Sequence, residues 1–270
     1  MKTRIIAAAV LIPVLFLLVL VVPKIAAAIV FGLLLAIGAY ELLYRTGLVR
    51  NVRMVFYSAV AAFALSIWSY YDSIRAYLLI GMVIFCMLLF SEMMIDHIKV
   101  QVEMVGLCIL AGFMIPYMLC ALIRILSASE GRSFILLPFT IAFLSDAGAY
   151  FVGLRFGRHK LAPVVSPNKT IEGMGGGILF AIIGVLVYSL ILRFALHLRV
   201  NFALAILYGF LGSLSGVMGD LCFSVIKRQT GIKDYGNLIP GHGGFLDRFD
   251  SLVMVAPLIE ALLLLFPLAV

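Results

Sequence analysis

Hydrophobic residues fill this chain in long uninterrupted runs that short polar segments separate. The runs are continuously apolar instead of alternating with polar residues, which is typical of membrane-spanning helices and not of the strands of a membrane barrel. Each run is close to the roughly 20 residues that a helix needs to cross a hydrocarbon core. Nine spans are expected, near residues 4–22, 26–44, 54–71, 76–95, 102–126, 134–153, 174–196, 202–224 and 251–269.

This pattern predicts an all-α fold, namely a polytopic integral membrane helix bundle with about nine transmembrane helices. Of the 270 residues, 64% are hydrophobic and 12% are charged, and the mean hydropathy of +1.20 excludes an ordinary soluble domain. An alternative interpretation of the first run is a secretory signal, but the run is long enough to span a membrane by itself. The four cysteines lie in apolar spans without Cys-x-x-Cys spacing and indicate neither a disulfide nor zinc.

Polar residues are distributed unevenly along the chain. Two long polar segments, 155–173 and 227–250, interrupt the second half, so we expect a scaffold over 1–126 and a catalytic region over 127–270. Two spans separate the segments, which places both on one side of the membrane, where they can build one site. Fourteen of the 20 lysines and arginines fall on that side, and the positive-inside rule then makes it cytoplasmic in a multi-pass protein of the cell membrane. Eight of these fourteen lie in the two segments, where substrate binding explains them equally well.

Four aspartates of the second half are candidate metal ligands. Asp146 and Asp220 lie in expected spans, where an ionised carboxylate is costly unless it is paired, hydrated or bound to a cation. The alternatives are a helix partner for Asp146 and an ion pair between Asp220 and Lys227. Asp247 and Asp250 are three residues apart, so a helix would place both on one face, although acids are also favoured at any helix N-terminus. Carboxylates and phosphates are ligands of Mg²⁺, which is the expected cofactor, with a second cation left open.

Basic and glycine-rich residues accompany these acids, as phosphoryl or nucleotidyl transfer requires, because cations neutralise phosphates while carboxylates hold the metal. Backbone N–H groups of a glycine run and of a helix start also suit phosphate. Each feature also has a purely structural explanation. The positive-inside rule alone would explain the basic residues, a turn would explain the glycine run, and capping of a helix N-terminus would explain Glu172. The expected catalytic residues are Asp220, Lys227, Arg228, His242 and Asp247. The expected phosphate-binding residues are Ser166, Asn168, Lys169, Thr170, Ser224, Lys233, Gly243, Gly244 and Arg248.

The segment 224–250, SVIKRQTGIKDYGNLIPGHGGFLDRFD, resembles the signature of phosphatidate cytidylyltransferases, also called CDP-diacylglycerol synthases, throughout its 27 residues. Residues 166–173 and 146–153 resemble upstream segments of that family. The resemblance implies an integral membrane enzyme that condenses CTP with phosphatidic acid to CDP-diacylglycerol and pyrophosphate. It implies no nucleic-acid partner, and a homodimer through the first-half helices would rest on analogy alone.

Two other classes of membrane protein compete with this interpretation. A cation-coupled transporter would use Asp146 and Asp220 as ion-binding residues, but it does not require the basic and glycine-rich array, and the sequence shows no internal repeat. A phosphotransferase that uses a CDP-activated lipid would carry Asp-Gly-x-x-Ala-Arg, which is absent from the sequence. Nucleotide use distinguishes the three, because a transporter consumes no CTP and a CDP-lipid-using enzyme releases CMP.

Overall fold

The fold is almost entirely helical. A computed structural model describes residues 13–71, 75–238 and 243–269. It is 77% helical with almost no strand, which confirms the all-α prediction. The chain forms two compact units, one of residues 1–128 with 229–249 and one of residues 129–228 with 250–270. The first unit therefore takes in most of the second polar segment, which the sequence grouped with the catalytic half.

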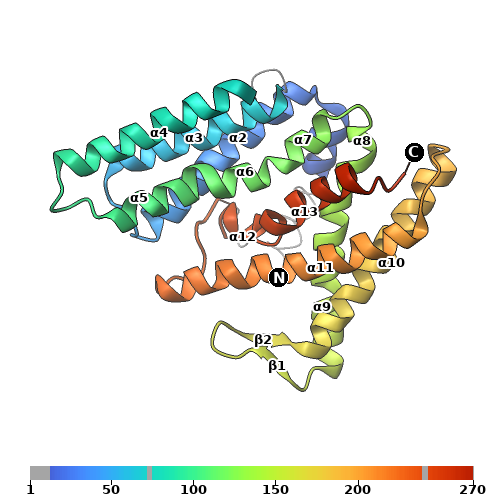
Figure 1. The fold of residues 1–270 in the computed structure, drawn as a ribbon. Coiled ribbons are helices and arrows are strands. Elements are labelled where there is room, and N and C mark those ends of the chain that lie inside the picture. Colours follow the sequence, from blue (N-terminus) through green and yellow to red (C-terminus); the bar gives the residue numbers. More distant parts are fainter. Residues whose placement is uncertain (1–12, 72–74, 239–242, 270) are drawn as a thin grey trace. The chain divides into compact units, whose positions relative to one another are not determined.

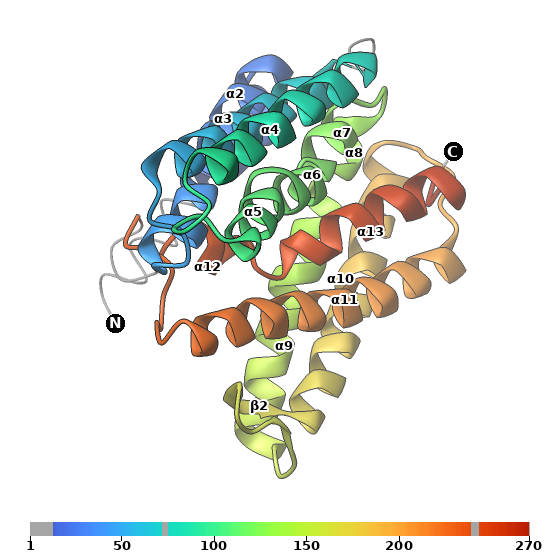
Figure 2. The same cartoon turned by 60° about the vertical axis from the view of Figure 1, so that its left-hand side comes forward.

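The first unit contains the helices of the N-terminal half and one short helix from later in the chain. Its helices α2, α3 and α4 follow one another side by side (Figures 1 and 2). Between α2 and α3 the hydroxyl of Ser66 donates to the carbonyl of Ala28 at 2.7 Å. The elements, with η for π-helical turns, are η1 (Leu17–Val21), α2 (Lys24–Tyr40), η2 (Glu41–Arg45), α3 (Val52–Tyr70), α4 (Arg75–Ile95), α5 (Val102–Ile109), η4 (Leu110–Met114), α6 (Ile115–Leu119), α7 (Ala121–Ser127) and α12 (Leu246–Phe249).

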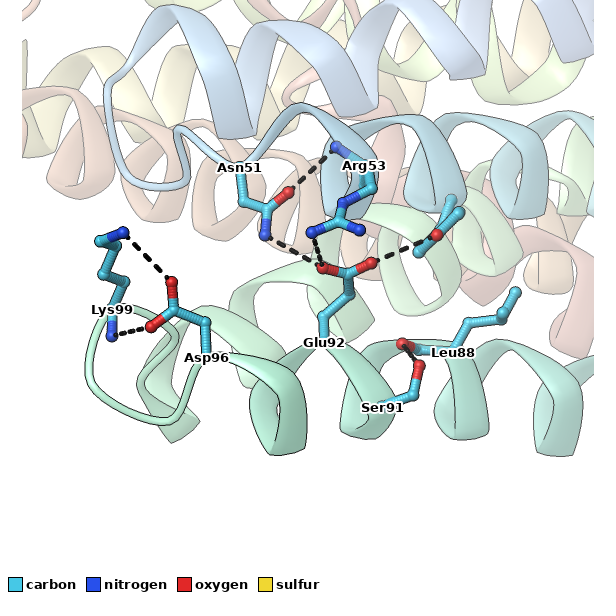
Figure 3. Close-up of polar contacts among 8 residues, drawn as sticks. Asn51, Arg53, Leu88, Ser91, Glu92, Asp96 and Lys99 are labelled. Carbon is cyan, nitrogen blue, oxygen red and sulfur yellow. Dashed lines mark hydrogen bonds and ion pairs between the residues drawn. The ribbon is translucent and has the colours of Figure 1, made fainter.

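One buried acid joins the start of α3 to α4 in this unit (Figure 3). Glu92 is 3% exposed, and its carboxylate accepts hydrogen bonds from the Asn51 amide at 3.4 Å and the Tyr57 hydroxyl at 3.3 Å. The same carboxylate forms an ion pair with Arg53 at 3.1 Å. Asn51 also caps α3, because its side-chain oxygen accepts the Arg53 N–H at 3.0 Å. These bonds offset the cost of burying a carboxylate among apolar helices.

The second unit joins long helices to a small antiparallel hairpin. In the hairpin, Lys160 pairs with Thr170 and Ala162 with Ser166. The hairpin lies at one end of α9 and α10 (Figures 1 and 2), at the position of the first polar segment. The elements are α8 (Gly131–Phe134), α9 (Leu136–Phe156), β1 (Lys160–Ala162), β2 (Ser166–Thr170), α10 (Ile171–Ala195), α11 (Phe202–Gln229) and α13 (Leu252–Leu265).

Seven helices of the described residues are long and apolar enough to cross a membrane, and they match the second to eighth expected spans. The last expected span contains α13, which at 14 residues is shorter than the roughly 20 that a span needs. The first part of the first expected span, residues 4–12, lies outside the described residues. The predicted count of nine is therefore not confirmed. The seven helices are Lys24–Arg45, Val52–Tyr70, Tyr77–Ile95, Val102–Ser127, Gly131–Phe156, Ile171–Ala195 and Phe202–Gln229.

Glycines allow α9 and α10 to pack closely in the second unit. A Cβ atom at Gly177 of α10 would lie 2.8 Å from the carbonyl oxygen of Ser145 in α9. A Cβ atom at Gly148 of α9 would lie 2.6 Å from the Cβ of Phe180. Small residues commonly allow such contacts between membrane helices. By contrast, a Cβ atom at the exposed Gly175 of α10 would meet no atom within 4 Å.

We expect Gly177→Ala to lower the free energy of unfolding by about 1–3 kcal/mol, because the added methyl group meets backbone that cannot easily move. Gly175→Ala is the matched control on the same helix, and the higher helix propensity of alanine should leave it neutral or stabilise it by up to about 1 kcal/mol. Thermal unfolding of both variants in one detergent measures the difference. Equal effects of the two substitutions would contradict the close packing at Gly177.

Candidate active site

A cavity of about 250 Å³ lies in the second unit, and α9, α10, α11 and the hairpin all contribute to its wall. Asp146 from α9 and Asp220 from α11 line it, together with Lys169 from β2. The rest of the lining includes apolar residues such as Leu161 and Met174 and polar residues such as Asn168 and Thr170. The two acids that the sequence placed within spans therefore share one cavity, which is the kind of environment that carboxylates among apolar helices require.

Asp220 takes an ion-pair partner from the hairpin. One of its carboxylate oxygens, Oδ2, pairs with Lys169 Nζ, and both side chains are about one quarter exposed. The other oxygen, Oδ1, accepts a hydrogen bond from the Ser224 hydroxyl at 3.2 Å, one helical turn further along α11. Ser224 and Asp220 thus lie on one helical face, as residues four apart in a helix do. The pair brings Lys169, from the first polar segment, into direct contact with Asp220, from an expected span.

Local hydrogen bonds hold the hairpin that carries Lys169. Thr170 caps α10, because its hydroxyl accepts the Gly173 N–H at 3.1 Å. Glu172, in the first turn of α10, accepts the backbone N–H of Arg158 at 3.0 Å and that of His159 at 3.2 Å. The same carboxylate contacts His159 Nδ1 at 2.6 Å. Thr170, predicted as a phosphate ligand, therefore has a structural role here, while Glu172 ties the entry of the hairpin to the helix that follows it.

Asp250 lies between α12 and α13, outside the seven long apolar helices, and close to α11. Burial and then the charge of Asp220 raise the pKa of Asp250 to about 7, against the opposing effect of Lys227. Its Oδ1 accepts the Ser251 N–H at 2.8 Å. A Cβ atom at Gly219 would lie 2.6 Å from the Asp250 carbonyl oxygen, so this glycine lets another backbone approach. Asp250 and Asp220 are thus electrostatically coupled.

Asp247 belongs to the first unit, where backbone groups hold its carboxylate. Its side chain is buried, and Oδ2 accepts the N–H of Tyr235 at 2.8 Å and that of Gly244 at 2.9 Å. The Gly244 N–H, which the sequence suggested for phosphate, thus bonds a carboxylate of the protein. The neighbouring Gly243 has a φ of 84°, a conformation that suits glycine.

Sequence reasoning missed the acid that joins this segment to α2. Glu41 is 2% exposed, and its Oε1 and Oε2 accept the N–H groups of Phe245 and Leu246, both at 3.1 Å. Glu41 falls in the region 1–126 that the sequence predicted to be a scaffold. Its position within an otherwise apolar span was the available signal, because ionisable residues in spans are functional candidates by default.

The remaining predicted residues are distributed over both units. In the second unit, Asn168 lines the cavity, and Arg228 Nε donates to the carbonyl of Val165 at 3.1 Å, which links α11 to the hairpin. His242 lies outside the described residues, and its role stays a prediction. The other predicted residues have these positions: Ser166 on β2, Lys227 in the last turn of α11, and the exposed Lys233 and Arg248 in the first unit.

The acids of the second unit fit a divalent cation in their chemistry. Among the residues that the structure describes, no three His, Cys, Asp or Glu side chains form a ready-made metal site. Mg²⁺, however, usually takes only one or two carboxylates, and phosphates and water supply its other ligands. Asp146 and Asp220 offer two carboxylates in one cavity, and both raise the pKa of Asp250. A divalent cation would relieve this mutual repulsion, so the donor set fits Mg²⁺.

The raised pKa of Asp250 predicts a pH-dependent cost of ionisation. Its pKa is about 7 in the folded protein and near 3.8 in an unfolded chain, so the stability from protonated Asp250 is fully present below pH 4 and is lost as the pH rises through 7. We expect Asp250→Asn to be more stable than the parent at pH 8 by about 1–3 kcal/mol, and nearly equal at pH 4. Thermal unfolding between pH 4 and 9 in a chelator tests this. A difference that does not vary with pH would contradict it.

Comparisons with known proteins give the same family that the signature resembled. The model of the cytidylyltransferase family matches residues 2–266. Relatives named phosphatidate cytidylyltransferase include those of Staphylococcus epidermidis, Staphylococcus haemolyticus and Staphylococcus aureus, which are 48%, 44% and 45% identical over 136 residues. Each match covers 50% of this chain and 51% of the relative, so the chain spans about half the length of the curated relatives it matches. Because the family model extends over nearly the whole chain, the chain belongs to the cytidylyltransferase family.

Proposed function

We propose that this chain is a phosphatidate cytidylyltransferase, which condenses CTP with phosphatidic acid to CDP-diacylglycerol and pyrophosphate at the cytoplasmic face of the cell membrane. The observation that carries the proposal is the cavity among membrane-spanning helices that Asp146, Lys169 and Asp220 line. Family membership supports it, as do the names of the relatives and the match of residues 224–250 to the signature. These observations favour an enzyme that handles phosphates at a membrane.

The central difficulty of this reaction is charge. Two highly charged anions must come together, and a third must leave, so positioned cations are the main requirement. Lys169 is held at the cavity by Asp220 and is therefore positioned to hold a phosphate oxygen there. Lys227 and Arg228 follow Asp220 on α11 and add positive charge to the same helix. The chain thus supplies cations from two elements of one unit.

The bond changes need no general base from the protein. An oxygen of the phosphatidate phosphate forms a bond to the α-phosphorus of CTP, and the bond from that phosphorus to the bridging oxygen of the β-phosphate breaks. Pyrophosphate leaves with the electron pair. A phosphate monoester with a second pKa of about 6 is already largely ionised at neutral pH, so no proton has to be removed first. The task of the protein is therefore orientation and charge neutralisation.

Mg²⁺ is the cofactor that we propose. Asp146, Asp220 and Asp250 of the second unit would hold it, and Asp247 remains a candidate ligand because of its place in the signature. When bound, the cation would offset the negative charge of the phosphates. Apart from this, Ser224 orients the carboxylate of Asp220 through the hydrogen bond to Oδ1.

The size of the cavity favours a lipid whose tails stay in the bilayer. Its volume of about 250 Å³ is slightly below the roughly 300–1,000 Å³ of pockets that enclose whole drug-sized ligands. It suits phosphate groups better than a complete diacylated lipid. We therefore expect the headgroup to enter between the helices while the acyl chains remain in the membrane.

We expect Lys169→Met to lower kcat/KM by about 100- to 1,000-fold, because the variant lacks a cation at the reacting phosphates. Purified protein is incubated with labelled CTP, phosphatidic acid and Mg²⁺, and CDP-lipid and pyrophosphate are measured. Lys160→Met is the matched control, because Lys160 is an exposed lysine of the same hairpin that does not line the cavity. It should keep the parent rate.

Three results would contradict the proposal. The parent protein would consume no CTP if it were a transporter, and it would release CMP if it used a CDP-activated lipid. Equal activity of Lys169→Met and Lys160→Met would remove the assigned role of the cavity. Thermal unfolding of both variants shows whether a lost rate reflects a lost fold.

A further inference from the structure

We propose that Glu41 is a positioning residue for the part of the signature that carries Asp247. This inference rests on the proposed function, because it assigns Glu41 a role in preparing that site. Glu41 lies 204 residues before Phe245, to whose N–H it is bonded. The contact therefore joins the scaffold half of the sequence to the signature within the first unit.

The burial of Glu41 requires partners, and these come from the signature. Glu41 begins η2 at the end of the apolar helix α2 and is 2% exposed. Its two carboxylate oxygens each accept one backbone N–H, from Phe245 and Leu246, at 3.1 Å. Bonds from N–H groups to a charged acceptor are stronger than those between neutral groups. The two bonds therefore fix the backbone at the start of α12.

The glycines of the signature make room for this carboxylate. A Cβ atom at Gly236 or at Gly244 would collide with the carboxylate of Glu41. Gly244 also donates its N–H to Asp247 at 2.9 Å. Gly244 thus lies beside both Glu41 and Asp247. The Glu41 carboxylate occupies the space that a side chain at position 244 would need.

Glu41 and Asp247 together bind the backbone of one short segment. Consecutive N–H groups of residues 244, 245 and 246 and the N–H of Tyr235 all donate to these two carboxylates. Asp247 is the second residue of α12, whose first residue, Leu246, is bonded to Glu41. A change in the bonds of Glu41 would therefore move the backbone from which the Asp247 side chain extends.

Apolar contacts already hold α12 against α2, so adhesion does not require an acid. The Phe31 ring of α2 lies 6.4 Å from that of Phe245 and 6.0 Å from that of Phe249, between ring centres. Phe245 and Phe249 also stack on each other at 4.4 Å. Because a buried charge is a poor source of net stability, the contribution of Glu41 is the orientation of the backbone, which apolar contacts do not define.

The test is Glu41→Gln in the full-length protein in detergent. Glutamine has nearly the shape of glutamate, but it is neutral and has only one acceptor oxygen. The N–H groups of Phe245 and Leu246 therefore no longer have one charged acceptor each. Hydrogen exchange should become faster in peptides that contain Phe245 and Leu246. The Mg²⁺ concentration for half-maximal activity should rise about 10- to 100-fold, as is typical when a residue that supports a metal ligand is lost. A purely structural role would lower the amount of folded enzyme without changing its dependence on Mg²⁺.

Glu92→Gln is the matched control. Glu92 is an equally buried acid of the first unit, but its bonds go to Asn51, Arg53 and Tyr57 (Figure 3). This variant should leave the exchange at Phe245 and the Mg²⁺ dependence of activity unchanged. If it changes both as much as Glu41→Gln does, the effect is general destabilisation and the inference is wrong.

A second variant keeps the inference testable if the Glu41→Gln protein does not fold. Glu41→Asp keeps the charge but withdraws the carboxylate by one methylene, and we expect an intermediate increase in exchange. Unchanged exchange at Phe245 in the variants, or loss of folding in both while Glu92→Gln folds, would overturn the inference. If the parent protein makes no CDP-diacylglycerol, the proposed function fails, and the exchange measurement still decides whether Glu41 orients this segment.

Discussion

The structure depends on one constraint, which is that a carboxylate among apolar helices must have partners. Two kinds of partner occur. Glu41 and Asp247 are held by backbone N–H groups, whereas Glu92 and Asp220 pair with basic side chains. Backbone partners fix both the acid and the segment that donates to it. A lysine on a flexible stem, such as the partner of Asp220, can instead exchange a carboxylate for a phosphate.

The sequence predicted most of the helices, because the length of an apolar run is a local property that needs no knowledge of packing. It did not predict the hairpin over 160–170, since two short polar strands leave no alternating pattern. It also left Glu41 in the scaffold. The partners of that residue come from positions more than 200 residues later, and no spacing rule connects them.

The sequence predicted which residues belong to the candidate site better than it predicted the hydrogen bonds and ion pairs among them. Placing both polar segments on one side of the membrane is consistent with the hydrogen bond between Arg228 and the Val165 carbonyl. The sequence did not predict the ion pair between Lys169 and Asp220, because it cannot show how Glu172 and His159 shape the hairpin that carries Lys169. Resemblance to a signature likewise identified a segment without identifying what each N–H in it binds.

The same constraint explains how a stable bundle can contain a cavity lined by charged side chains. Glu41, whose partners are backbone N–H groups, can keep them permanently and serves to orient the chain. The acids of the second unit repel one another, and the pKa of about 7 at Asp250 measures how far burial and this repulsion oppose ionisation. Stability is therefore lower there than neutral side chains would allow, as is common where a site must bind a charged ligand. We propose that this repulsion favours cation binding, because Lys227 only partly offsets it.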